Sequence, residues 1–123
     1  MTAVSPSPCF RFVERVTRAF LTSGGHDTTT LSSLRITAAR PGSIEAKLVV
    51  GPHNLNRLGS VHGGLLCTIV DTMGSLALSS KGLYFTGVST DIHTTFARAA
   101  GKAGDELVLR GEVTTLGEIH VGL

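Results

Sequence analysis

The chain of 123 residues contains no tryptophan, a single tyrosine and only two cysteines. Charged residues make up 16% of the sequence, and the formal net charge at neutral pH is only +2. Proteins that bind nucleic acids usually concentrate Lys and Arg in a basic patch, and this sequence has no such cluster. Its apolar runs are all much shorter than the ~20 residues that a membrane-spanning helix needs. The composition therefore predicts neither a nucleic-acid partner nor a membrane span.

The few cysteines and histidines also bear on redox and metal chemistry. Cys9 and Cys67 are far apart, neither belongs to a CxxC pair, and no secretory signal accompanies them. We therefore expect free thiols in a reducing compartment. The five histidines are scattered, without an HExxH motif or a pair four residues apart, so no metal site is expected.

Hydrophobic residues make up 41% of the chain, and its 15 glycines indicate tight turns and close backbone approaches. This length and composition predict one globular domain over residues 1–123. Residues 1–8, with two prolines and small polar side chains, are expected to be flexible.

A helix is predicted over residues 9–21, because Phe10, Val13, Val16 and Phe20 recur at helical spacing. Three arginines lie elsewhere on the helical wheel, which is also typical of a mitochondrial targeting peptide. An acidic residue within the helix and the lack of a cleavage context favour the other interpretation, a helix packed on the domain.

Residues 23–27 are expected to close this helix and open a loop. Two runs of alternating apolar residues, 34–38 and 44–50, then flank the turn signal Pro41-Gly42. They predict an antiparallel hairpin, with Leu34, Ile36 and Ala38 on the same face of the first strand.

Residues 62–80 are apolar on most of the helical wheel, which predicts a buried helix. Its narrow polar stripe consists of small residues: Gly64, Thr68, Asp71, Thr72, Ser75 and Ser79. Strands are predicted over 85–98 and 106–113, with another beginning at 119. The fold class is therefore α+β: a curved antiparallel sheet wrapped around one central helix.

The strongest candidate site lies where this helix begins, at His62-Gly63-Gly64. The free N–H groups of a first helical turn, with the positive end of the helix dipole, suit a developing oxyanion. Glycine at position 63 lets a carbonyl approach the backbone closely, and the carboxamide of Asn56 supplies a second donor.

Asp71 is the second candidate, because a carboxylate in an apolar helix is costly unless it is paired, hydrated or functional. One interpretation is a structural Asp, bonded by the hydroxyls of Thr68, Thr72 or Ser75 on an exposed strip. The other is a catalytic carboxylate, which the adjoining His-Gly-Gly helix start favours.

Asn56, His62-Gly63-Gly64 and Asp71, together with the later segment 87–91, resemble the hotdog-fold acyl-CoA thioesterases of the thioesterase superfamily member 2 type. The resemblance covers about residues 10–123, and the spacing Asn-x5-His-Gly-Gly-x6-Asp is far more specific than a lone glycine motif. It implies a hotdog fold and hydrolysis of acyl-CoA. The family's chains continue beyond the position of Leu123, so we expect the last strands of the usual fold to be missing here.

The resemblance also implies a role for each site residue. The Gly63 N–H and Asn56 polarise the thioester carbonyl, and His62 helps to position the substrate. Asp71 acts as general base or nucleophile, and Ser89 orients the attacking water.

Further candidates bind the substrate rather than react with it. They are Gly64 in the first helical turn and a set of cations for the phosphates of coenzyme A: Arg57, Lys81, Arg98 and Lys102. The alternative for these cations is that they are solvated surface charges. No cofactor is expected, because a thioester is already activated and needs only an oriented water and an oxyanion site.

Asp71 follows Gly63 by eight positions, or about 12 Å along a helix, so one helix does not easily present both to a single thioester. We therefore expect a homodimer with shared active sites, in agreement with the family, and further a dimer of dimers. The expected compartment is cytoplasmic or mitochondrial. Alternative functions are a non-catalytic acyl-CoA-binding or remnant hotdog protein, or a hotdog hydratase or dehydratase, since a fold alone does not fix a reaction.

Overall fold

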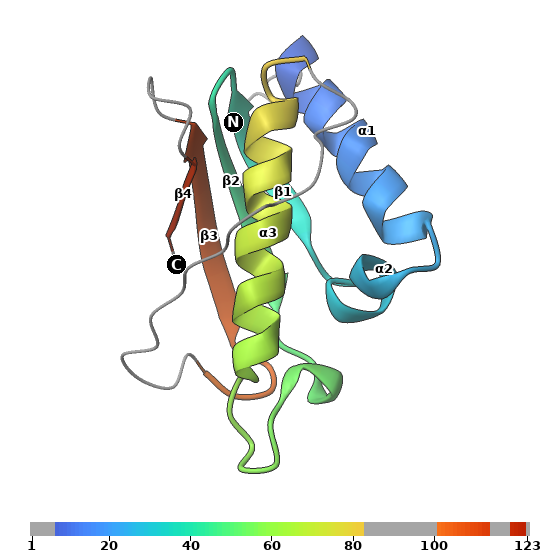
Figure 1. Cartoon of the computed structure of the whole chain (residues 1–123), viewed down its shortest axis with the longest axis vertical. Coiled ribbons are helices and arrows are strands. Elements are labelled where there is room, and N and C mark those ends of the chain that lie inside the picture. The colour runs from blue at the N-terminus through green and yellow to red at the C-terminus, as the bar shows by residue number, and fades with distance from the viewer. Residues whose placement is uncertain (1–6, 83–100, 114–118, 123) are drawn as a thin grey trace, which may run out of the picture.

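A four-stranded antiparallel sheet in the order β1-β2-β3-β4 carries the long helix α3 on one face (Figure 1). The computed structural model describes residues 7–82, 101–113 and 119–122. The elements in chain order are α1 (Pro8–Thr22), α2 (His26–Thr30), β1 (Arg35–Arg40), β2 (Ser43–Val49), the 3₁₀ helix η1 (Pro52–Asn54), α3 (Gly63–Ser79), β3 (Glu106–Val113) and β4 (Ile119–Gly122).

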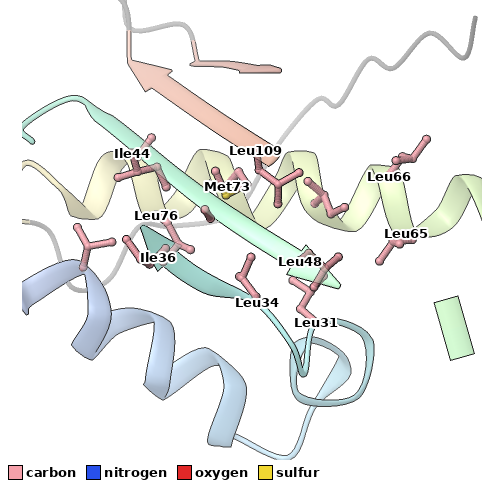
Figure 2. Close-up of a cluster of buried hydrophobic side chains, with 14 of the residues drawn as sticks. Leu31, Leu34, Ile36, Ile44, Leu48, Leu65, Leu66, Met73, Leu76 and Leu109 are labelled. Atoms are coloured by element: carbon pink, nitrogen blue, oxygen red, sulfur yellow. The ribbon is translucent and has the colours of Figure 1, made fainter. Parts of the chain in front are cut away.

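The predicted central helix is confirmed as α3, which packs on β2, β3 and β4. Its buried apolar side chains include Leu65, Ile69, Met73 and Leu76, at the three- and four-residue spacing of one helix face. Figure 2 shows Met73 and Leu76 among inward-pointing residues of the strands, and the buried cluster includes Ile36, Ile44, Leu48 and Leu109. Full burial of each such side chain contributes about 1.5–3 kcal/mol, which makes this interface the main core.

The predicted hairpin is also confirmed, because β1 pairs with β2 through the turn that contains Gly42, at a φ of 85°. One part of the prediction for β1 is wrong: Ala38 does not lie on the same face as Leu34 and Ile36. A register shift between Ile36 and Ala38 leaves Thr37 as an extra residue, so Ala38 is exposed and Ala39 turns toward the core. A β-bulge of this kind reverses the alternation beyond it.

Helix α1 begins earlier than the sequence indicates. The Ser7 side chain accepts a hydrogen bond from the Phe10 N–H at 3.1 Å, and Pro8 is the first helical residue. Residues 7 and 8 are therefore part of the helix start rather than of a flexible end. Val13 and Val16 are fully buried, so α1 is packed on the domain, against β1 and α3.

The segment predicted as a loop after α1 contains the short helix α2. Gly24 takes a φ of 82°, and the Thr28 hydroxyl donates to the Phe20 carbonyl at 3.2 Å while accepting from the Gly24 N–H at 3.0 Å. Leu31, which follows α2, is 1% exposed and anchors the turn in the core. Helix α2 thereby lies against α1 and α3.

The strands predicted at 106–113 and from 119 onward are confirmed as β3 and β4. The strand predicted over 85–98 lies outside the described residues. Among the residues that are described, no helix combines the length and apolar character needed to cross a bilayer.

Candidate active site

The first turn of α3 leaves a backbone donor available. His62 precedes the helix, and its Nδ1 accepts a hydrogen bond from the Gly64 N–H at 2.8 Å. Within the described part of the chain, no atom accepts a hydrogen bond from the Gly63 N–H. That N–H lies at the positive end of the helix dipole, where an anionic oxygen is most stable.

The hydrogen bond from the Gly64 N–H also determines the tautomer of the His62 ring. Because Nδ1 accepts a hydrogen bond, the neutral imidazole carries its proton on Nε2. The side chain is exposed, so the Nε2–H is a second donor beside the helix start.

Asn56 sits in a tight loop that returns the chain to the start of α3. Leu55 and Val61 form an antiparallel bridge, and the Asn56 N–H donates to the Ser60 carbonyl at 2.7 Å. The carboxamide Oδ1 accepts from the N–H groups of Leu58 and Ser60, at 2.9 and 3.1 Å. Since the oxygen is occupied by the loop, the Nδ2 group is the part of Asn56 that remains to donate outward.

Asn54 is a further polar residue of this region, which the sequence analysis missed. It is 2% exposed, and its Nδ2 donates to the Thr30 carbonyl at 2.9 Å. Its Oδ1 accepts from the Gly51 N–H, and its carbonyl accepts from the His62 N–H at 2.8 Å. The sequence does not distinguish Asn54 from other loop asparagines, since only the structure shows that it is buried and bonded to Thr30 and His62.

Asp71 lies two turns further along α3 and is exposed. The Thr68 hydroxyl donates to the Gly64 carbonyl at 2.9 Å, and the Thr72 hydroxyl donates to Asp27 Oδ1 at 3.2 Å. Because each hydroxyl donates its proton to one of these acceptors, neither Thr68 nor Thr72 donates the side-chain hydrogen bond to Asp71 that the structural interpretation assumed.

The candidate substrate-binding residues fall into two groups. Arg57 is exposed next to Asn56, and Gly64 is exposed in the first turn of α3. Lys81 is exposed just beyond the opposite end of the helix, which rises about 24 Å from Gly63 to Ser79. Ser89 and Arg98 lie outside the described residues. One chain thus places Asn56 and Arg57 in the loop that leads into the His62–Gly64 turn, and Asp71 and Lys81 progressively further along α3.

The known proteins and solved structures that resemble this chain include proteins named as esterases and thioesterases. The chain is 39% identical over 106 residues to a Schizosaccharomyces pombe protein named "Putative esterase C31F10.02", covering 86% of this chain and 66% of the relative. It is 31% identical over 88 residues to human acyl-coenzyme A thioesterase 13, covering 72% of this chain and 62% of the relative. The chain thus matches slightly less than two thirds of the length of these curated relatives.

The crystal structure of zebrafish thioesterase superfamily member 2 matches with a TM-score of 0.80 and 27% identity, over 94% of this chain and 86% of that one. This likeness confirms the predicted hotdog fold. Residues 58–120, which include the helix start and Asp71, match the family model described as Thioesterase superfamily. The chain belongs to the thioesterase superfamily.

Proposed function

We propose that this chain hydrolyses acyl-CoA thioesters, giving a carboxylic acid and free coenzyme A. The observation that carries the proposal is the Gly63 N–H at the start of α3, from which no described residue accepts a hydrogen bond. The loop that leads to this helix start occupies the Asn56 Oδ1 and leaves its Nδ2 as a second donor. In the proposed site these two donors bind the thioester carbonyl oxygen and stabilise it as it becomes an oxyanion. A relative named acyl-coenzyme A thioesterase supports the substrate class.

In the proposed reaction the substrate carbonyl oxygen accepts from the Gly63 N–H and the Asn56 Nδ2, and the exposed His62 Nε2–H helps to position the substrate. Asp71 takes a proton from a water whose oxygen bonds to the carbonyl carbon. The tetrahedral intermediate then collapses, the C–S bond breaks, and the sulfur leaves with the electron pair. The proton held by Asp71 neutralises the departing thiolate.

In a variant of this route the Asp71 carboxylate bonds to the carbonyl carbon, and the C–S bond breaks to give an anhydride and the thiolate. A water then hydrolyses the anhydride, which restores Asp71 and supplies the proton for the thiolate. Ser89 orients the water in either route, whether it attacks the thioester or the anhydride. The proposal includes no cofactor or metal, because the thioester is already activated and the donors above supply the oxyanion site.

The proposed active unit is a homodimer in which two α3 helices pack antiparallel about a two-fold axis. The start of one helix then faces the middle of the other, which brings Gly63 of one subunit to Asp71 of its partner. The small residues Gly64, Thr68 and Ser75 permit this close approach. The proposed complete assembly is a dimer of dimers.

The same arrangement brings together Arg57 and Lys81, which lie far apart within one chain. When the start of one helix faces the middle of the other, the end of the second helix extends past that start. Lys81 of the partner subunit then approaches the loop that holds Arg57. Arg57, Gly64 and this lysine form the proposed binding surface for coenzyme A, with Arg98 as a further candidate. A role in fatty acid metabolism, in the cytoplasm or the mitochondrion, remains a prediction.

The decisive experiment is release of free thiol from a panel of acyl-CoAs, followed with a thiol-reactive dye. Turnover of at least one acyl-CoA is expected. Tight binding without thiol release would indicate an acyl-CoA-binding protein, and hydration of an enoyl-CoA without thiol release would indicate a hydratase. Either result would overturn the proposed hydrolysis.

A further inference from the structure

Helix α2 contacts the polar stripe of α3 through two consecutive residues. His26 Nε2 lies 2.9 Å from the Thr68 hydroxyl oxygen, and the Thr72 hydroxyl donates to Asp27 Oδ1 at 3.2 Å. Thr68 and Thr72 are four residues apart, so they lie one above the other on α3. Two adjacent side chains of α2 thus reach two successive turns of the helix.

The first of these contacts continues to the start of α3. The Thr68 hydroxyl donates its only proton to the Gly64 carbonyl, at 2.9 Å. The hydroxyl oxygen therefore accepts the hydrogen bond from His26, and the donor is the Nε2–H. At the same residue, the Gly64 N–H donates to His62 Nδ1. The residue that follows Gly63 is therefore held at both its carbonyl and its N–H.

The other end of α2 reaches the same turn by a second path. The Thr30 carbonyl accepts from the Nδ2 of the buried Asn54, and the Asn54 carbonyl accepts from the His62 N–H. One path thus ends on the residue before Gly63 and the other on the residue after it. Both paths begin on a helix of five residues.

We propose that α2 positions the donor turn His62–Gly64, with His26 as the positioning residue that acts through Thr68. This inference rests on the proposed function, because it gives that turn its catalytic role. An oxyanion donor is effective only when it is held at hydrogen-bond distance, about 3 Å, from the position where the negative charge develops in the transition state. Two connections on either side of Gly63 provide this constraint.

The test compares four variants by kcat and KM for a hydrolysed acyl-CoA. His26→Ala and Thr68→Val each remove the first path, and we expect each to lower kcat by roughly tenfold to a hundredfold with little change in KM. His26→Gln keeps an N–H donor in reach of Thr68 and is expected to restore most of kcat. Thr72→Val is the matched control: it removes one hydroxyl contact to α2, a turn further from Gly63, and should keep the wild-type kcat.

A second measurement does not depend on activity. The backbone amide resonances of Gly63 and Gly64 are expected to shift in His26→Ala and Thr68→Val, and to stay in place in Thr72→Val. If the wild-type chain releases no thiol, the proposed function fails, while these resonances still report whether α2 positions the turn.

Two results would overturn the positioning role. One is unchanged amide resonances of Gly63 and Gly64 in both His26→Ala and Thr68→Val. The other is a kcat per folded molecule that stays at the wild-type value in these variants while Tm falls, which would make α2 a purely structural element.

Discussion

Gly63 and Asp71 lie on the same helix, α3, and the eight residues from one to the other correspond to about 12 Å of helix rise. A water attacking a thioester has to lie about 3 Å from the carbonyl carbon, with the oxyanion donors about 3 Å from its oxygen. Within one subunit the helix therefore separates the proposed donor from the proposed base. Two antiparallel helices remove that separation.

This relationship predicts complementation between two inactive variants. Asn56→Ala removes the donor side of the site, and Asp71→Ala removes the carboxylate side. When the two proteins are unfolded and refolded together, random pairing makes about half of the dimers mixed, each with one intact site. Thiol-release assays should then recover roughly a quarter of the wild-type activity.

The control is each variant refolded alone, which should remain inactive. If mixed dimers are detected by mass spectrometry and the mixture is still as inactive as its parents, both groups act within one chain and the shared site is wrong.

Asp71→Asn is expected to remove most of the hydrolysis and to leave the fold intact. The substitution is nearly isosteric on an exposed helix position, but it abolishes the proton acceptor. Loss of a general base lowers kcat by about 10²–10⁴-fold. Circular dichroism and thermal melting verify the fold, and wild-type turnover in a well-folded variant would contradict the assignment.

Gly63→Val is expected to damage turnover more than stability. Valine is tolerated in a helix at a cost of roughly 0.7 kcal/mol relative to alanine, and glycine is a poorer helix former than that. The branched Cβ, however, occupies the space through which the substrate carbonyl approaches the N–H. A variant that melts far below the wild type, with normal kcat per folded molecule, would show that Gly63 is needed for packing instead.

Much of the architecture could be predicted from the sequence, because it follows from local patterns. The apolar wheel of residues 62–80 indicates the buried helix, and alternation on either side of Pro41-Gly42 indicates the hairpin. The His-Gly-Gly start of the helix also indicates where its free N–H groups lie. Each of these signals is contained in a few neighbouring residues.

The features that the sequence did not indicate depend on tertiary contacts. The bulge at Thr37 leaves no local mark and changes only which alanine faces the core. The α2 segment has turn-like composition and becomes helical because Thr28 bonds the end of α1 and Leu31 is buried. Nothing in the sequence distinguishes Asn54 from Asn56, whereas the structure buries Asn54 and bonds it to both α2 and His62.

Cys9 offers a test of the packing at the end of α3. Burial raises the pKa of the Cys9 thiol above its ordinary value of 9.0, and the thiol donates to the Ser80 carbonyl at 3.3 Å. Only the thiolate is alkylated, so the rate of Cys9 alkylation should rise at a higher pH in the folded protein than in the urea-unfolded chain.

The corresponding effect on stability has a definite sign. Above pH 9 the unfolded chain loses the Cys9 proton first, so this group makes the folded state less stable as the pH rises. Peptide mapping of the alkylated protein gives the two pH–rate profiles. Profiles with the same midpoint would contradict burial of the thiol.

The close packing of α3 on β3 is expected to depend on Gly111. A Cβ at this buried position would lie 3.1 Å from the Met73 carbonyl oxygen and 3.5 Å from the Ala77 Cβ. The first neighbour is helix backbone, so it can yield only if α3 moves away from the sheet. Gly111→Ala should therefore lower the free energy of unfolding by about 1–3 kcal/mol, measured by urea denaturation.

The control on the same strand is Val108→Thr. The Val108 side chain is 56% exposed on the opposite face, so this substitution should change the free energy of unfolding by less than about 0.5 kcal/mol. Equal stability of the Gly111→Ala variant and the wild type would contradict the prediction and mean that α3 yields by the few tenths of an ångström that the added Cβ needs.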